Sequence, residues 1–359
     1  MGLMDRLALS ALYTLDPETA HHAALYALEH GLAGTRHIPD DPILATDVLG
    51  LHFKNPIGLA AGFDKDARVA DAMLNLGFGF VEAGTVTPKP QPGNPKPRLF
   101  RLEQDAAVIN RLGFNSGGVE AFAQRLAARR QRNAPGIVGA NVGKNRDTVD
   151  GAADYVAGIE KVAGLADYLV VNISSPNTPG LRSLQARAPI EDLLKRVLAA
   201  RDRSVPGPKK PPLLAKVGPD LSDEQLNDIA EVALSVGVDG LIVGNTSVGL
   251  RDGLHGARKG EKGGLSGRPL FAFSTRALTI AARAAQRRIV LVGTGGVSSG
   301  ADAYAKIRAG ATLVELYTAM IYAGPGIVAR IHTELAALLA RDGFYAQLHR
   351  MQYREDAVA

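Results

Sequence analysis

The 359-residue sequence contains no cysteine, and only 5% of its residues are aromatic. Without cysteine the chain cannot form a disulfide, a thiolate metal site, a cysteine-ligated iron–sulfur cluster or a cysteine nucleophile. No apolar run approaches the roughly 20 residues that span a bilayer, and no charged segment with an apolar core marks a secretory signal. The sequence therefore predicts a chain that neither crosses a membrane nor is exported by a visible signal.

The sequence also lacks motifs for a metal site, for the usual hydrolase chemistry and for nucleic-acid binding. The eight histidines are dispersed without metal-ligand spacing, and no HExxH or GxSxG motif occurs. The net charge of +5 is modest, and the basic clusters at 129–132 and 258–262 contain no interleaved aromatic residues. We therefore expect no metal site and no nucleic-acid partner.

The chain does have a hydrophobic share of 46% and 40 glycines, a composition typical of an α/β protein with many tight turns. Apolar strand-like runs alternate eight times with helix-compatible segments. This pattern predicts a (β/α)₈ barrel, with a doubly wound sheet as the alternative, and places the active site at the C-terminal ends of the strands. The strands are expected near residues 57–61, 79–83, 137–140, 168–172, 213–217, 240–244, 289–293 and 312–316, and helices over 120–131, 189–201, 223–236, 274–286 and 301–309.

The first 40 residues differ from the rest and predict two domains, a helical hairpin over 1–40 and the barrel over 41–359. Asp16 and Pro17 have the pattern of a helix start, which separates two short amphipathic helices. Such a hairpin either packs on the main domain, or lies on a bilayer surface and guards an apolar channel. A β-hairpin is expected at 47–53, and two long inserts, 87–102 and 247–268, are expected to act as lids.

Polar residues gather after the predicted strands. Residues 172–178 contain two asparagines, two serines and a threonine, which favour either a ligand-binding loop or an Asx-rich turn. The glycine-rich turn at 293–300 opens a helix and, with the turn after the eighth strand, predicts a phosphate site to which Ser298 or Thr318 adds a hydroxyl.

Two lysines also follow strands. Lys216 is expected to face an anion or an electron-rich ring, because an unpaired buried ammonium is costly. A salt bridge to a core carboxylate such as Glu82 or Glu315 is the alternative. Lys65 in turn has Asp64 beside it as a possible structural partner.

Four motifs, at residues 55–65, 97–102, 110–115 and 172–178, resemble those of the quinone-dependent dihydroorotate dehydrogenase family. The resemblance covers nearly the whole chain. It implies an FMN-containing barrel that oxidises dihydroorotate to orotate in pyrimidine biosynthesis and passes electrons to a membrane quinone. It also implies a peripheral membrane protein attached through the N-terminal helices, at the cytoplasmic face of the inner membrane if the source is bacterial.

The resemblance also implies which residues form the site. It implies Ser175 as the catalytic base, and a substrate site of Lys65, Asn110, Arg111, Leu112, Gly113, Phe114, Asn172, Asn177, Asn245 and Thr246. The implied flavin contacts are Ala61, Gly62, Phe63, Asp64, Lys65, Thr85, Asn141, Asn172, Lys216, Gly244, Gly267, Gly296, Tyr317 and Thr318. The implied quinone contacts are His21, Arg101 and Tyr317.

Serine is a poor base at its ordinary pKa, so Ser175 needs a proton relay, for which Thr178 and water beside Phe114 are candidates. The soluble classes of the family use a cysteine base, and one of them needs an iron–sulfur subunit, so a chain without cysteine resembles neither. Two other functions stay open: another FMN barrel that oxidises dihydropyrimidines or hydroxy acids, and an inactive barrel that serves as a membrane-surface binding module.

Overall fold

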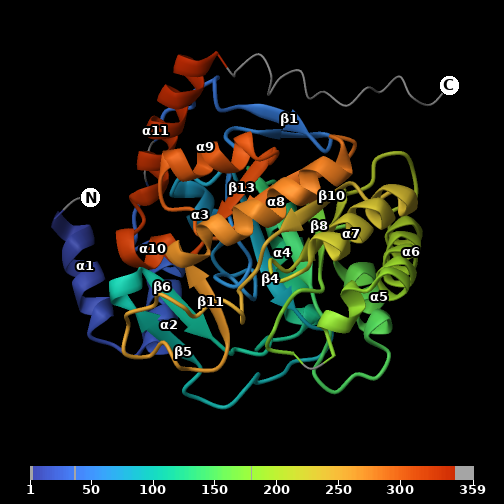
Figure 1. Ribbon diagram of the computed structural model, residues 1–359, viewed down its shortest axis with the longest axis horizontal. Coiled ribbons are helices and arrows are strands. Elements are labelled where there is room, and N and C mark those ends of the chain that lie inside the picture. Colours follow the sequence, from blue (N-terminus) through green and yellow to red (C-terminus); the bar gives the residue numbers. More distant parts are fainter. Residues whose placement is uncertain (1–2, 36–37, 179, 344–359) are drawn as a thin grey trace.

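The computed structural model describes residues 3–35, 38–178 and 180–343 (Figure 1). Eight parallel strands close into one barrel in chain order, which confirms the predicted barrel over the doubly wound sheet. The strands are β3 (Ile57–Leu59), β4 (Phe80–Val86), β7 (Ile137–Val142), β8 (Tyr168–Asn172), β9 (Leu213–Val217), β10 (Gly240–Val243), β12 (Val290–Thr294) and β13 (Leu313–Leu316).

Helices surround the barrel. The five predicted helices correspond to α4 (Val119–Gln131), α6 (Arg187–Ser204), α7 (Asp223–Val236), α8 (Phe271–Ala285) and α9 (Gly300–Arg308). Four more were not predicted: α3 (Ala70–Asn75), α5 (Gly151–Val162), α10 (Thr318–Ala323) and α11 (Ile327–Asp342). Short 3₁₀ turns lie at η1 (Glu103–Asp105), η2 (Arg182–Gln185) and η3 (Arg268–Leu270).

The N-terminal end of the barrel is closed by the predicted β-hairpin, β1 (Thr46–Val48) and β2 (Leu51–Phe53). Phe53 is fully buried and meets the ring of Phe80 edge-on at 5.4 Å. Apolar side chains of the barrel strands, among them Val170, Leu214 and Ile242, fill the interior next to this hairpin, so the barrel is closed at this end. Only the opposite end is left for a ligand.

The two predicted inserts are not simple loops. The first contains β5 (Leu99–Leu102) and the second contains β11 (Gly264–Gly267). Both strands pair with β6 (Ala107–Asn110), which lies outside the inserts, in an antiparallel sheet of order β11-β6-β5. Figure 1 shows this sheet at the opposite end of the molecule from β1. It covers the C-terminal ends of the barrel strands, and whether it moves as a lid stays a prediction.

The N-terminal hairpin forms as expected from α1 (Leu3–Tyr13) and α2 (Pro17–Glu29). Asp16 caps α2 by accepting hydrogen bonds from the backbone N–H groups of Glu18 and Thr19. Both helices lie beside β5 and β6 (Figure 1). Residues 1, 2, 36 and 37 of the predicted hairpin domain, and 344–359 of the predicted barrel domain, lie outside the described residues.

A buried ion pair joins the hairpin to the sheet. Arg98 donates to both carboxylate oxygens of Glu18, at 2.7 and 3.1 Å, and both side chains are buried. Burial raises the pKa of the Glu18 carboxyl, but its bonds to Arg98 and Lys96 hold that pKa below its ordinary value. Such a bidentate pair is costly to break, so the hairpin is fixed in orientation over the sheet.

The outer side of the hairpin is apolar. Six large apolar side chains are markedly exposed among the described residues, and four of them, Leu7, Leu15, Tyr26 and Leu32, belong to the hairpin region. No helix in the described part of the chain is both long and apolar enough to cross a bilayer. The hairpin thus presents an apolar surface without forming a membrane span.

Candidate active site

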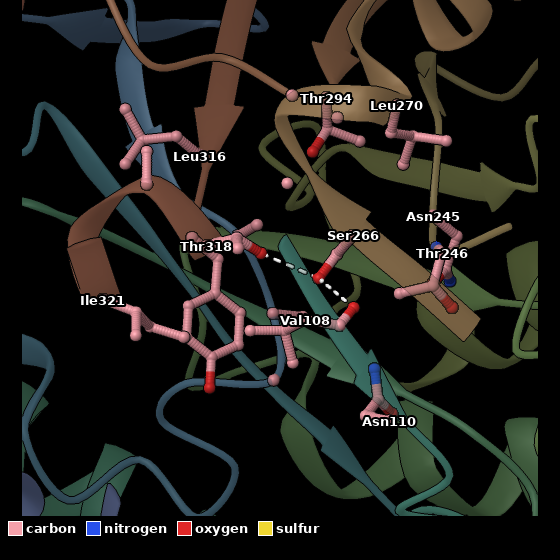
Figure 2. Close-up of a pocket in the computed structure, with 18 of the residues that line it drawn as sticks. Val108, Asn110, Asn245, Thr246, Ser266, Leu270, Thr294, Leu316, Thr318 and Ile321 are labelled. Atoms are coloured by element: carbon pink, nitrogen blue, oxygen red, sulfur yellow. Dashed lines mark hydrogen bonds between the residues drawn. The ribbon is translucent and has the colours of Figure 1, made fainter. Parts of the chain in front are cut away.

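A cavity of about 430 Å³ opens at the C-terminal ends of the strands, under the β11-β6-β5 sheet. This volume is in the range of small-molecule sites. Figure 2 shows side chains reaching into it from both sides, with Val108, Asn110 and Ser266 from the covering sheet and Thr294 and Leu316 from the barrel strands. The position is the one that the barrel fold predicts for a catalytic site.

Most predicted site residues meet here. Those that line the cavity are Ala61, Gly62, Lys65, Thr85, Asn110, Leu112, Gly113, Phe114, Asn172, Ser175, Asn177, Lys216, Asn245, Thr246, Gly267, Gly296, Tyr317 and Thr318. These residues come from nine separate segments of the chain, so the fold brings them together. Their individual roles stay predictions.

Other predicted residues lie elsewhere. Phe63 and Asp64 border a neighbouring, smaller cavity instead. Asn141 and Gly244 sit behind the wall of the large cavity, where Asn141 is fully buried and donates to Glu82 at 2.7 Å. The Arg111 guanidinium bonds Glu261 and the carbonyls of Pro97 and Lys262, so it ties the sheet to the 247–268 insert and does not face the cavity.

One end of the cavity is formed by the glycine-rich turn after β12. Gly295 and Gly296 have φ of 101° and 77°, a region that favours glycine. A Cβ on Gly296 would lie 2.5 Å from the backbone N of Phe271, so the turn presses closely against the start of α8. These glycines bring peptide groups to the cavity at a place suited to an anion.

The hydroxyls predicted to assist there have partners within the protein. Ser298 donates to Asp302 at 2.8 Å, and Thr318 donates to Ser266 at 2.8 Å, the contact drawn as a dashed line in Figure 2. Neither hydroxyl donates freely into the cavity in this arrangement. The predicted hydroxyl contacts therefore need a rotation of each side chain, which leaves the backbone as the main donor.

The sequence interpretation missed two cations at this end. Arg268 and Arg330 line the cavity, and Arg330 donates to the carbonyl of Ser298 at 2.9 Å. Lys306 lies behind the turn, fully buried, and donates to Ser274 at 2.7 Å and to the carbonyl of Thr294 at 3.3 Å. Arg330 stands on α11, beyond the last strand, where no local sequence signal links it to the site.

At the other end, four asparagines in two hydrogen-bonded pairs, Asn177 with Asn110 and Asn245 with Asn172, form an amide wall. Asn177 donates to the backbone carbonyl of Asn110 at 3.1 Å, and Asn245 donates to the Ser174 hydroxyl at 2.7 Å. Asn172 donates to Thr85 at 2.8 Å. An amide offers both donor and acceptor atoms, so this wall suits a planar ligand whose edge carries N–H and C=O groups.

Ser175 is buried beside this wall. Its Oγ accepts from the backbone N–H of Asn177 at 3.3 Å, which orients the hydroxyl. Thr178 Oγ1, on the same loop, is buried and has no hydrogen-bond partner among the described residues. An unpaired buried hydroxyl next to a serine is what a proton relay through water requires, and it supports the predicted pair without testing it.

Lys65 is not paired with Asp64, as one interpretation of the sequence allowed. The Asp64 carboxylate instead accepts from the backbone N–H groups of Arg68 and Val69, at 2.7 and 2.8 Å. The Lys65 amine donates to the side-chain oxygen of Asn115. Burial, with a smaller effect of Arg98, lowers the pKa of the Lys65 ammonium to about 7. The cavity therefore holds a lysine ready to gain a proton when an anion binds.

For Lys216 the alternative interpretation is confirmed. Its ammonium contacts Glu82 at 2.7 Å and Glu315 at 3.1 Å, and the three side chains are buried in the barrel. Lys216 also lines the cavity. The expectation that it also faces a bound anion or an electron-rich ring stays a prediction.

A second cavity of about 60 Å³ lies between the hairpin and the barrel, lined by His21, Phe63, Lys65 and Tyr317 among others. The ring of Phe63 meets His21 at 5.2 Å and Tyr317 at 5.6 Å, both edge-on. Burial, with a smaller effect of Lys65, lowers the pKa of His21 to about 3, so its ring is neutral. This row of rings leads from the hairpin to the large cavity.

Arg101, predicted beside His21, is placed differently. Its guanidinium donates to the carbonyls of Leu12, Tyr13 and Leu15 at 3.1–3.2 Å and lies over the Tyr13 ring. It holds the end of α1 against β5. In the described part of the chain, no group of histidine, aspartate and glutamate side chains could hold a metal ion.

Comparisons with known proteins agree with this geometry. The sequence matches the dihydroorotate dehydrogenase family over residues 43–339. It is 57% identical to a dihydroorotate dehydrogenase (quinone) of Azorhizobium caulinodans over 329 residues, 91% of this chain and 92% of that protein. It is 51% identical to the mitochondrial dihydroorotate dehydrogenase (quinone) of Mus musculus over 335 residues, 92% of this chain and 85% of that protein.

Solved structures give the same result. The fold is similar to that of a dihydroorotate dehydrogenase of Eimeria tenella in complex with ferulenol, with a TM-score of 0.89 and 43% identity over 92% of this chain and 93% of that one. The ligand-free Eimeria enzyme also gives a TM-score of 0.89, at 42% identity over 94% of this chain and 100% of that one. The chain is an oxidoreductase that belongs to the quinone-dependent class of the dihydroorotate dehydrogenase family.

Proposed function

We propose that the protein oxidises dihydroorotate to orotate in pyrimidine biosynthesis, with FMN as hydride acceptor and a membrane quinone as final electron acceptor. The observation that carries this proposal is the shared cavity of Ser175, the amide wall and the glycine-rich anion site. The reaction needs a base, a ring-binding wall and a phosphate site, and the common cavity of these residues supports the proposal.

The residues present fit FMN. The cavity is long enough to have two chemically distinct ends, and the anion end combines the Gly295–Gly296 turn with Arg330. Glycine at position 62, with φ of 107°, lets the backbone approach a flat ring beside Tyr317. FMN supplies the hydride-accepting and electron-passing chemistry when bound. Gly62, Thr85, Lys216 and Tyr317 would border its ring, and the turn after β12 would hold its phosphate.

The protein's own groups account for the rest of the reaction. Lys65 binds the substrate carboxylate, and Asn110, Asn172, Asn177 and Asn245 hold the ring edge. Ser175 accepts the proton from C5, and Thr178 passes it onward through water. The Lys216 ammonium places positive charge at the cavity floor, where it stabilises negative charge that develops during the reaction.

The hairpin serves the second half of the reaction. Its exposed leucines attach it to a bilayer surface, and the ring row of His21, Phe63 and Tyr317 provides an apolar approach from there to the cavity. We therefore place the protein peripherally on a membrane, at the cytoplasmic face of the inner membrane if its source is bacterial. Arg101 positions α1 for this purpose.

The proposal is tested by following orotate in a steady-state assay. Purified protein with dihydroorotate should form orotate beyond one equivalent per flavin only when a quinone is added, and added NAD⁺ should not replace the quinone. Orotate formation with NAD⁺ alone, or none with any quinone tried, would refute the assignment of the acceptor.

Replacing Gly296 with alanine should weaken FMN binding at least about tenfold, equivalent to ~1.4 kcal/mol. The new Cβ would lie 2.5 Å from the Phe271 backbone, so the turn must shift away from the phosphate. Titration of the deflavinated protein with FMN measures the change. Gly253→Ala is a matched control, because Gly253 has a similar φ of 78° but nothing within 4 Å. Equal losses in the two variants would show that backbone strain, not the turn, is responsible.

Orotate affinity should fall as the pH rises above about 7, because the bound carboxylate favours protonated Lys65 and the free enzyme loses that proton near this pH. Below that pH the affinity should level off. His21, with a pKa of about 3, does not titrate in this range. Flavin absorbance changes on orotate binding give the profile. Lys65→Met should bind weakly at every pH, and the exposed Lys54→Met control should keep the wild-type profile. A flat wild-type profile would contradict this role.

A further inference from the structure

Two carboxylates and one ammonium lie inside the barrel below the cavity. Glu82 on β4 and Glu315 on β13 are both fully buried, and Lys216 on β9 lies between them at 2.7 and 3.1 Å. Tyr168 is also buried and is a titratable group near both carboxylates. Its burial, and to a smaller extent the two carboxylates, raise the pKa of Tyr168 well above the ordinary value. Tyr168 is therefore neutral and cannot balance their charge.

The charges do not cancel if both carboxyl groups are ionised. Two carboxylates and one ammonium leave one negative charge among buried side chains, and an uncompensated buried charge is strongly unfavourable. One bound proton removes this excess. The arrangement then contains one carboxylate, one carboxylic acid and one ammonium, and its net charge is zero.

Two oxygen atoms show where the proton lies. Glu82 Oε2 and Glu315 Oε1 are buried without a hydrogen-bond partner among the described residues. The two side chains are within hydrogen-bonding reach of each other. Burial, and to a smaller extent the charge of Glu82, raise the pKa of Glu315 well above its ordinary value. A proton on Glu315 that is donated to Glu82 gives both of these oxygens a partner.

The donors around Glu82 identify it as the ionised member. Its Oε1 accepts from Lys216 at 2.7 Å and from Asn141 at 2.7 Å. Among the described residues, Glu315 accepts the longer contact from Lys216, at 3.1 Å, and no second side-chain donor. Hydrogen-bond donors stabilise a carboxylate. Glu82, which accepts the shorter contacts, therefore keeps the negative charge, and Glu315 keeps the proton.

We propose that Glu82 and Glu315 hold a single proton between them, and that this acid–carboxylate pair acts as a positioning unit that fixes Lys216 and the charge beneath the bound cofactor. Lys216 lines the cavity while the pair holds it from behind. The effect on the cofactor rests on the proposed function, but the shared proton does not. Burial lowers the pKa of Lys216, and the two carboxyl groups outweigh this and raise it, so the amine stays charged.

Infrared spectroscopy of the holoenzyme tests the shared proton directly. At about pH 8 the wild type should show a C=O stretching band of a protonated carboxyl group; Asp64, with a pKa of about 6, is ionised there. Either Glu315→Gln or Glu82→Gln should remove the band, because the remaining carboxyl group then pairs with Lys216 in ionised form. The exposed Glu224→Gln is the matched control and should retain it.

The flavin reduction potential tests the positioning role. Glu315→Gln replaces an acid by a neutral isostere and should leave the potential unchanged, whereas Glu82→Gln/Glu315→Gln leaves Lys216 without an anion. The double variant should favour the reduced flavin at least tenfold, a positive shift of about 30 mV for a two-electron couple.

Absence of the wild-type band, or its loss in only one of the two single variants, would overturn the shared proton. An unchanged potential in the double variant would overturn the positioning role. If the double variant does not fold, the infrared result of the isosteric single variants still decides the first claim. A protein that fails to oxidise dihydroorotate would refute the proposed function but would leave the infrared test unaffected.

Discussion

Replacing Ser175 with alanine should slow reduction of the bound flavin by dihydroorotate by about 10²–10⁴-fold, the usual contribution of a general base. Flavin content should not change, because Ser175 lies at the amide wall and not at the anion end. Anaerobic stopped-flow absorbance measures the reduction rate, and the yellow colour of the purified variant measures cofactor retention. This combination separates loss of chemistry from loss of the site.

The size of the effect follows from the surroundings of Ser175. It is buried and its Oγ accepts one backbone N–H bond, so its hydroxyl is held in place at the amide wall. Alanine at 175 removes only the hydroxyl oxygen, so the loop should keep its path. Orotate should still bind through the asparagines, with an affinity within a few-fold of the wild type.

Ser183→Ala is the matched control for this experiment. Ser183 belongs to the same connection, is exposed, and donates to the carbonyl of Gly180 at 2.6 Å. Its loss should leave flavin reduction unchanged. If Ser175→Ala reduced its flavin at the wild-type rate, another base would have to act, and the role assigned to this loop would be wrong.

Charged substitutions on the hairpin should weaken membrane binding without affecting reduction of the flavin by dihydroorotate. Leu7 and Leu32 are 57% and 73% exposed, so Leu7→Glu/Leu32→Glu should cost little folding stability. A glutamate inserted at an apolar bilayer contact is unfavourable, and we expect vesicle binding to weaken at least about tenfold. Vesicle sedimentation measures binding, and the rate with a vesicle-embedded quinone should fall in parallel.

The control is Val149→Glu, which adds a glutamate at a fully exposed apolar residue far from the hairpin in sequence. It should bind vesicles as the wild type does. Flavin reduction by dihydroorotate should be normal in both variants, since the hairpin does not contribute to the amide wall. Normal vesicle binding by the double variant would show that these leucines do not form the membrane contact.

Much of the fold could be predicted from the sequence because local signals agreed with the final structure. The helix α7 was predicted over its full length, and the structure shows why: Ser222 and Gln225 form a capping box at its start, and Gly237 ends it with φ of 83°. The barrel strands were visible as short apolar runs bounded by turns, since both faces of each strand are buried.

The covering sheet could not be predicted in this way. β11 has the sequence Gly-Leu-Ser-Gly, which has little strand propensity, and it exists because Ser266 and Leu265 pair with Val108 and Ile109 of β6. Such pairing joins residues more than 150 positions apart. The sequence showed two inserts, but not that a strand of each pairs with β6 between them.

The candidate site, like the fold, could be predicted from the sequence only in part. Strand ends were enough to predict Asn172, Lys216 and Gly296 as neighbours, because the barrel brings all strand ends to one face. They were not enough to show that Asn141 faces Glu82 behind the wall, or that Arg330 reaches the anion end from α11. Those placements depend on side-chain direction and on helix packing, which sequence spacing does not fix.

The central claim is tested most directly by an anaerobic titration of the purified protein with dihydroorotate, followed by addition of a quinone. Our account predicts a yellow protein that bleaches with one equivalent of dihydroorotate per flavin, yields orotate, and recovers its colour with the quinone. A protein that dihydroorotate does not bleach, while a dihydropyrimidine or a hydroxy acid does, would contradict it. A colourless protein that takes up no added FMN would contradict it equally.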